Sequence, residues 1–341
     1  MTTIFEEEIR SQADILRRRA KDSALEALAV ASEFRDVDYL LVAARGSSDN
    51  AAVFFQYFAG QELGVLVALA TPSLYESGRT IGLKGAGVLA ISQSGRTPGL
   101  VDVVEAATSQ GRPSAVITND PDSPLGQSTS TVIALRAGAE RALASTKTFT
   151  TTWHALAQLV EAMKGSPLEG LDSLPETVER TASWALSSAL PVEMLNAKRG
   201  LTIVGRGVGQ AVAAEVAIKI REVSGIRAEA YSAADYLHGP VGADGENSTL
   251  LLVVTDELAT DVAETLLTEC QRFSMRTVVL RSKARGAFSC DAEIVIDEAG
   301  PNWSVALAEV IVGQVLALRV GELRGRPIDT SPGLHKVTLT A

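Results

Sequence analysis

Three ionisable side chains share one face of an otherwise apolar helical segment. Glu215, Lys219 and Glu222 stand at positions i, i+4 and i+7 of AVAAEVAIKIREVSG, residues 211–225. At about 100° per residue they fall within about 60° of one another. The stripe is either a solvated face with ordinary i,i+4 pairing or a carboxylate held beside a lysine in a cleft. In the second interpretation Lys219 keeps Glu222 ionised, partial burial raises its basicity, and Glu222 removes a proton from carbon next to a carbonyl or iminium.

A hydroxyl-rich turn is the second chemical feature. ISQSGRTP, residues 91–98, ends a strand-like segment and opens a helical one. We expect Thr97 to cap that helix and Pro98 to occupy its first turn. Free N–H groups, the positive helix end and the Ser92 and Ser94 hydroxyls would then suit a phosphate monoester. The alternative is a polar turn with a good cap. Because no GxxxxGK[ST] motif is present, we do not expect a nucleoside triphosphate.

Other polar groups occupy similar strand-to-helix positions. Ser47-Ser48 follows the first strand-like segment, Ser145-Thr146 opens a long helix, and Thr118–Asp120 ends a further strand. These turns would let several hydroxyl groups converge on one ligand. Among the histidines, His238 precedes a Gly-Pro turn, where it is either structural or suited to proton transfer in sugar ring opening. His154 is interpreted as a packing residue, and His335 in the tail has no assigned role.

Short apolar segments alternate with helical patterns along the first half of the chain. The patterns predict strands at 39–44, 65–70, 87–92, 113–118 and 131–135, and helices at about 50–61, 99–110 and 149–163. Buried strands that alternate with helices are typical of a parallel sheet covered on both faces.

The pattern restarts after a polar stretch at 165–175, which we interpret as a linker. Strands are predicted at 201–204, 250–254, 276–280 and 292–296, helices at 212–223 and 305–320, and an extended tail at 325–341. A shift of 161 positions lays Arg45-Gly46 on Arg206-Gly207 and Gly64 on Gly225. With the matching element order, this predicts an internal duplication. Ligands of such sheets bind beyond the carboxyl ends of the strands.

Composition excludes several classes of protein. The net charge of 341 residues is −10, and no Lys/Arg block is present, so nucleic-acid binding is not expected. Cys270 and Cys290 lack partners at metal spacing, which favours reduced thiols in the cytoplasm and neither a metal nor an organic cofactor. The N-terminus predicts a charged helix and no signal peptide, and no apolar run suggests a membrane span of about 20 residues.

Together these stretches resemble the sugar isomerase (SIS) family, which includes the isomerase portion of glucosamine-6-phosphate synthases. The resemblance covers nearly the whole chain in family order. It is carried by Arg45-Gly46-Ser47-Ser48, Ile91–Thr97, Ala137–Glu140, Ala144–Lys147, Glu215–Glu222, Ala228–Tyr231, His238-Gly239-Pro240 and Leu334–Val337.

The resemblance implies an α/β fold of two tandem SIS domains. Each would be a flavodoxin-like, doubly wound, five-stranded parallel sheet, at residues 1–170 and 176–325, followed by a C-terminal active-site tail at 326–341. It also implies a homodimer with shared active sites.

The resemblance further implies roles for individual residues. Glu222 matches the base that moves the proton between C1 and C2, with Lys219 beside it. His238 matches the ring-opening histidine from the partner subunit, and Lys336 matches the tail lysine that forms a Schiff base with the ketose. Glu140 matches an active-site glutamate. The sugar phosphate would be bound by Ser47, Ser48, Ser92, Gln93, Ser94, Thr97 and Ser145.

Departures from the synthases shape the expected activity. Position 2 is Thr, and the first strand begins near residue 39, so we expect no glutaminase domain. Arg96 stands where the synthases have Glu, which resembles stand-alone members of the family; it is either a cation near the phosphate or a solvated loop arginine. We therefore expect an amino-sugar-phosphate deaminase/isomerase that converts glucosamine 6-phosphate and water to fructose 6-phosphate and ammonia. The alternatives are a fructosamine-6-phosphate deglycase, a galactosamine-6-phosphate enzyme, and a non-enzymatic sugar-phosphate sensor.

Overall fold

The chain folds into two compact units, each with its own parallel sheet. The computed structural model describes residues 2–330. Of these, 14–140 and 147–171 form one unit, here called the N-terminal unit, and 2–13, 141–146 and 172–330 form the other, the C-terminal unit. The chain leaves the N-terminal unit for the C-terminal unit between residues 171 and 172. This point lies within residues 165–175, the stretch that we interpret as a linker from the sequence.

The N-terminal unit contains a five-stranded sheet in the order β2-β1-β3-β4-β5, with parallel pairing throughout. Its strands are β1 (Tyr39–Ala43), β2 (Val67–Leu69), β3 (Ala86–Ser92), β4 (Ser114–Thr118) and β5 (Val132–Ala134). Its helices are α2 (Ser47–Leu63), α3 (Pro72–Glu76), α4 (Leu100–Ser109) and α5 (Lys147–Lys164). The strand order reverses between β1 and β3, which makes that pair the topological switch point of the unit.

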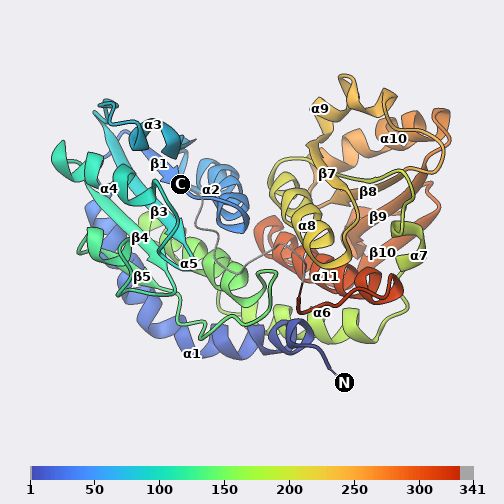
Figure 1. Ribbon diagram of the computed structural model, residues 1–341, viewed down its shortest axis with the longest axis horizontal. Helices are drawn as coiled ribbons and strands as arrows, with labels where there is room; N and C mark the ends of the chain where they lie inside the picture. Colours follow the sequence, from blue (N-terminus) through green and yellow to red (C-terminus); the bar gives the residue numbers. More distant parts are fainter. Residues whose placement is uncertain (1, 331–341) are drawn as a thin grey trace. The chain divides into compact units, whose positions relative to one another are not determined.

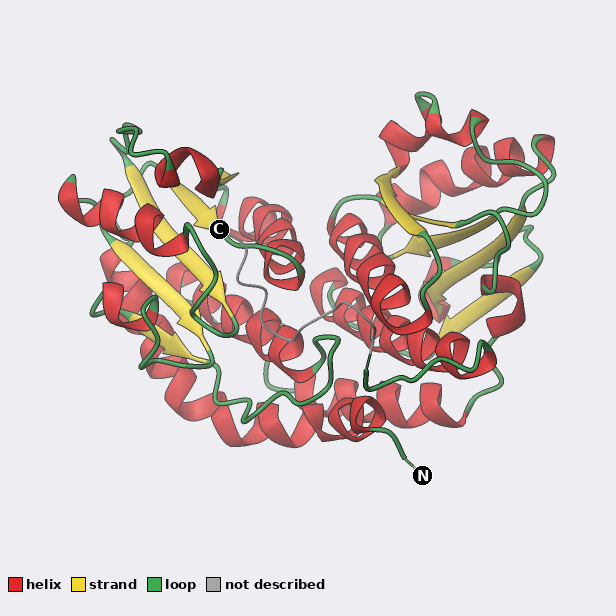
Figure 2. Cartoon of the chain, viewed as in Figure 1, coloured by secondary structure: helices red, strands yellow, loops and turns green. Residues whose placement is uncertain are grey.

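Helices cover both faces of this sheet, as Figures 1 and 2 show. Leu41, Ala43, Val88, Ala90 and Val116 alternate along three strands and pack with the buried face of α4. On the other face α2 and α5 lie together, and the Phe54 and Trp153 rings stack with centroids 3.5 Å apart. Burial on both faces explains why these strands are continuous apolar runs.

The C-terminal unit repeats this topology. Its sheet has the order β10-β9-β8-β6-β7, which is the same succession of neighbours as in the first sheet. The strands are β6 (Leu201–Gly205), β7 (Ala228–Ser232), β8 (Thr249–Val254), β9 (Arg276–Ser282) and β10 (Ala292–Ile296). The helices are α6 (Leu174–Ser187), α7 (Val192–Leu195), α8 (Val208–Ser224), α9 (Ala233–Leu237), α10 (Glu257–Arg272) and α11 (Asn302–Leu323). The predicted architecture of two five-stranded parallel sheets is confirmed.

Two glycines explain why α2 and α8 begin earlier than the sequence pattern predicts. The expected starts were near Asn50 and Val212, but the helices begin at Ser47 and Val208. Gly46 (φ 62°, ψ −133°) and Gly207 (φ 56°, ψ −130°) occupy the two N-cap positions in nearly the same conformation. Glycine adopts this region without a Cβ penalty, so each Arg-Gly turn starts its helix at once. The shared geometry supports the internal duplication.

Helix α11 is long and apolar enough to span a membrane by composition alone, contrary to the sequence expectation that no run reaches this length. However, 94% of its most apolar window is buried inside the protein. It packs against α8 and α6 within the C-terminal unit. Its hydropathy therefore reflects a central core helix.

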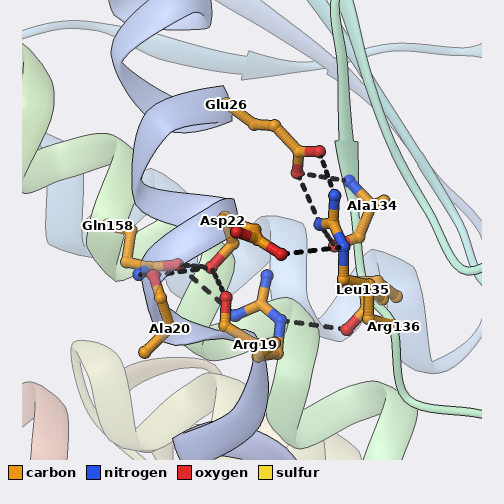
Figure 3. A network of polar contacts seen from close by, with 9 residues as sticks. Arg19, Ala20, Asp22, Glu26, Ala134, Leu135, Arg136 and Gln158 are labelled. Atoms are coloured by element: carbon orange, nitrogen blue, oxygen red, sulfur yellow. Dashed lines mark hydrogen bonds and ion pairs between the residues drawn. The ribbon is translucent and has the colours of Figure 1, made fainter.

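Helix α1 (Ile4–Glu33) contributes residues to both units, and its later part closes an edge of the N-terminal sheet. Figure 3 shows Glu26 accepting hydrogen bonds from the Ala134 N–H at 2.9 Å and from the Arg136 guanidinium. Arg19 Nε donates to the Leu135 carbonyl at 2.9 Å. The helix thus provides partners for backbone groups at the end of edge strand β5 and at the residue that follows it, which a free edge would expose.

The same part of α1 binds α5 through a buried polar cluster. Arg19 Nη1 lies 2.5 Å from His154 Nδ1, and the Ser23 hydroxyl donates to Gln158 Oε1 at 2.5 Å. His154 is buried, as expected of a packing residue, and burial beside the Arg19 charge holds its pKa well below the ordinary value.

Candidate active site

The hydroxyl-rich turn after β3 is held by its own side chains. Ser92 Oγ accepts a hydrogen bond from the Gly95 N–H at 3.1 Å and lies 2.9 Å from Thr97 Oγ1. The Ser94 hydroxyl accepts from the Arg96 N–H at 3.3 Å. These contacts curl the backbone so that several hydroxyl groups occupy one short turn, as a phosphate site requires.

The expectation that Thr97 caps the following helix is wrong. Helix α4 begins at Leu100, and its N-cap is Gly99 in a left-handed conformation (φ 78°) with no side-chain cap. Thr97 lies two residues before the cap, and its hydroxyl contacts Ser92 instead. The turn is therefore longer than predicted, and the Thr97 side chain belongs to the hydroxyl cluster.

The turn after β1 lies at the same edge of the sheet. Strands β1 and β3 pair in parallel, with Ala43 opposite Ala90. The segments that follow them therefore leave the sheet side by side at the topological switch point. Ser47 and Ser48 occupy the first turn of α2 there, where N–H groups and the positive helix end favour anions.

The segment after β4 forms hydrogen bonds with the backbone of the serine turn. The Asn119 N–H donates to the Gln93 carbonyl at 3.1 Å, and the Leu125 N–H donates to the Gly95 carbonyl at 3.1 Å. A Cβ on Gly95 (φ +63°) would overlap the Ser123 hydroxyl. The predicted proximity of residues 118–120 to the serine turn is thus observed.

Arg96 forms an ion pair with Asp120 at the rim of this turn. Arg96 Nη2 lies 3.0 Å from Asp120 Oδ2, and the two side chains are 52% and 39% exposed. Arg96 is therefore a loop arginine with a carboxylate partner on the neighbouring turn. An exposed pair of this kind is weak and leaves the guanidinium able to exchange partners.

Glu140 lies in the loop between β5 and α5. Its Oε1 accepts from the Thr148 N–H at 3.2 Å, and its Oε2 contacts the Thr148 hydroxyl. The buried carboxylate thus binds the first turn of α5, where the helix dipole stabilises negative charge. Lys147 Nζ donates to the Ala139 carbonyl at 2.6 Å and fixes the same loop.

Ser145 precedes α5 and belongs to the C-terminal unit, in the segment 141–146. There the buried carboxylate of Glu8 accepts from the Arg141 N–H at 2.6 Å and the Ala142 N–H at 3.3 Å. The convergence of Ser145 with the serine turn stays a prediction.

The ionisable stripe on α8 is buried, which rules out a solvated face for two of its members. The side chains of Glu215 and Lys219 are 0% and 1% exposed, whereas Glu222 is 27% exposed. Lys219 Nζ lies 3.5 Å from Glu215 Oε1 and 2.9 Å from Glu222 Oε2. The lysine thus lies between two carboxylates, and only the Glu222 end of the stripe is accessible to a ligand.

His238 and Lys336 complete the predicted catalytic set. His238 is exposed and follows the last residue of the short helix α9, as its C-cap. Within residues 2–330 no hydrogen bond joins its ring to Glu222. His335 and Lys336 lie outside the described residues.

Two residues of interest received no role of their own in the sequence analysis. Asn119 joins three strand ends, as described below. Glu309 is fully buried in α11, where the Thr255 hydroxyl donates to its Oε2 at 2.5 Å. Burial raises the pKa of Glu309 to about 8. A lone carboxylate inside the apolar sequence ALAEVIVG was the available signal. The described residues contain no cluster of three or more metal-ligating side chains.

Comparison with known proteins places this fold in one family. The SIS domain model matches the chain twice, at residues 33–162 and 194–320. The protein therefore belongs to the SIS domain family, and the two matches correspond to the two sheets.

Individual proteins are similar to this chain in sequence or in structure. The chain is 27% identical over 324 residues to the glutamine–fructose-6-phosphate aminotransferase (isomerizing) of Halobacterium salinarum, covering 89% of this chain and 52% of that protein. It thus spans about half the length of the curated relatives it matches. A candidate phosphosugar isomerase from Silicibacter pomeroyi has a similar structure, with a TM-score of 0.82 and 27% identity over 96% of this chain and 99% of that one. A glucosamine-6-phosphate deaminase from Thermotoga maritima shares the fold, with a TM-score of 0.77 at 19% identity over 98% and 99% of the two chains.

Proposed function

We propose that this protein is an SIS-type sugar-phosphate isomerase that acts as an amino-sugar-phosphate deaminase. Its reaction would convert glucosamine 6-phosphate and water to fructose 6-phosphate and ammonia. The observation that carries the proposal is the partly exposed carboxylate of Glu222, 2.9 Å from a lysine that is itself 1% exposed. Further support comes from the hydroxyl-rich turn at a switch point and from relatives whose names specify sugar phosphates.

The phosphate of the substrate would bind at the carboxyl edge of the N-terminal sheet. The Ser92, Ser94 and Thr97 hydroxyls and the first turn of α2 supply donors there. Binding the phosphate, which does not react, would hold the sugar in a fixed orientation for the reaction.

The Glu222 carboxylate would transfer the proton. His238 opens the sugar ring to give the free aldehyde. From the open-chain substrate with a C2 ammonium group, Glu222 removes the C2 proton while one ammonium proton passes to O1, which gives an enolamine. Glu222 returns its proton to C1, which leaves a protonated imine at C2. Water adds to C2, the C–N bond breaks, and ammonia leaves. All atoms of substrate and water are accounted for in fructose 6-phosphate and ammonia.

Lys219 would assist the proposed base, Glu222, as its neighbouring cation. Its ammonium lies between Glu215 and Glu222 and places a positive charge 3.5 Å from the first carboxylate and 2.9 Å from the second. Lys336 would engage the open-chain ketose. We further propose a cytoplasmic homodimer in which His238 reaches the partner's site, a role consistent with its exposed position at the end of α9.

The direct test is to incubate the purified protein with glucosamine 6-phosphate and to measure ammonia and fructose 6-phosphate. Galactosamine 6-phosphate and a fructose-amine 6-phosphate serve as parallel substrates, because only the pocket would distinguish them. Glu222→Gln should lower kcat by about 100-fold or more, as expected for a general base.

The matched control is Glu264→Gln, the same change on an exposed helical carboxylate of α10, which should leave kcat unchanged. Full turnover by Glu222→Gln would contradict the assigned role. Saturable binding of hexosamine phosphates without turnover of any of them would instead identify a sensor.

A further inference from the structure

Asn119 binds the segments that follow two other strands. It comes directly after β4, which lies between β3 and β5 in the sheet. Its backbone N–H donates to the Gln93 carbonyl at 3.1 Å, in the serine turn after β3. Its side chain reaches the opposite way: Oδ1 accepts from the Ala137 N–H at 2.8 Å, and Nδ2 donates to the Gly138 carbonyl at 2.8 Å. Asn119 thus connects two segments: the turn proposed to bind phosphate, and the loop that carries Glu140.

The loop after β5 needs such a contact because its backbone is unusual. Arg136 adopts a left-handed conformation (φ 50°), which costs a non-glycine residue roughly 1–3 kcal/mol unless its surroundings enforce it. Glu26 enforces it by binding the Arg136 guanidinium through both carboxylate oxygens, at 2.9 and 2.5 Å. Gly138 is also left-handed (φ 69°), so the chain turns twice within three residues.

Other side chains bind the end of the loop that precedes α5, at residues 139 and 140. Lys147 binds the Ala139 carbonyl, and Thr148 binds the Glu140 carboxylate. Between Arg136, held by Glu26, and these contacts at residues 139 and 140, the Asn119 amide satisfies one N–H and one carbonyl on the adjacent residues Ala137 and Gly138. An amide matches this pair because it offers one acceptor and two donors. A carboxylate in its place would oppose the Gly138 carbonyl with a second acceptor.

We propose that Asn119 is a positioning residue, which fixes the loop bearing Glu140 relative to the turn that holds the sugar phosphate. This inference rests on the proposed function. Because the bond to Gln93 comes from the backbone, substitutions of the side chain remove only the contacts to Ala137 and Gly138 and leave the serine turn in place. Loss of the side chain should therefore impair catalysis and spare binding of the phosphate group.

The test compares Asn119→Ala and Asn119→Asp with wild type. For both variants we expect kcat on the turned-over hexosamine phosphate to fall about tenfold, since catalysis depends steeply on placement, while KM changes less than about twofold. The matched control is Gln127→Ala, which removes one side-chain amide bond, to the Pro121 carbonyl at 3.0 Å, from the loop after β4. It should preserve both constants.

A second readout does not depend on activity. Hydrogen exchange at the Ala137 amide should accelerate in Asn119→Ala, whereas exchange at Gly95 should not change. An unchanged Ala137 amide, or a variant with wild-type kcat, would overturn the positioning role. If wild type itself turns over none of the hexosamine phosphates, the proposed function fails, and the exchange experiment still decides whether Asn119 holds the loop.

Discussion

The Lys219 ammonium lies 2.9 Å from the Glu222 carboxylate, yet the lysine side chain is 1% exposed and the glutamate 27%. A lysine is rarely buried so completely without partners. Here Glu215 supplies a second carboxylate from one turn earlier, at 3.5 Å. The Glu222 carboxylate is therefore partly accessible, whereas its counter-ion, the Lys219 ammonium, is buried.

Removing that counter-ion should destabilise the fold as well as the site. In Lys219→Met the fully buried Glu215 loses its cation, and breaking a buried ion pair in this way costs about 3–5 kcal/mol. The measurement is the free energy of unfolding in urea. The double variant Lys219→Met/Glu215→Gln should recover much of the loss, because it no longer buries a charge. Equal stability of Lys219→Met and wild type would contradict the burial of the stripe.

Gly95 should be required for the shape of the serine turn. A Cβ there would overlap the Ser123 hydroxyl, and the residue has a left-handed φ of +63°. We expect inorganic phosphate to raise the Tm of wild type. We expect Gly95→Ala to destabilise the protein by about 1–3 kcal/mol and to abolish that rise.

The matched control for this substitution is Gly111→Ala. Gly111 has almost the same φ, +62°, but a Cβ there would meet nothing within 4 Å. It should show the backbone penalty and retain the response to phosphate. Loss of that response in both variants would show that the close contact with Ser123 is unimportant.

Glu309 should make stability depend on pH. Burial raises its pKa from 4.5 to about 8, so the folded protein keeps a proton that the unfolded chain releases. Its contribution to stability is therefore present below about pH 4.5 and is lost as the pH rises towards 8. Glu309→Gln keeps an acceptor for Thr255 but cannot ionise. Unfolding free energies measured across this range should fall less steeply for the variant, and parallel curves would refute the assignment.

Much of the architecture was predictable because it rests on local patterns. Buried strands such as 86–92 are continuous apolar runs, and their alternation with helices indicated the parallel sheets. Strand β7 was not predicted from its residues, because Glu229 and Tyr231 interrupt the apolar pattern of this edge strand with polar atoms that bind each other at 2.8 Å. The Thr97 cap was wrong because Gly99, with its left-handed backbone, begins the helix instead.

The sequence by itself determined which chemical groups share a surface within one element. Glu215, Lys219 and Glu222 fall on one side of α8 because helical periodicity depends only on spacing along the chain. Only the tertiary structure decided which of the three is accessible, that Arg96 pairs with Asp120, and that Asn119 joins the segments after β3 and β5. Burial and hydrogen-bond partners come from segments distant in the sequence, so no local pattern encodes them.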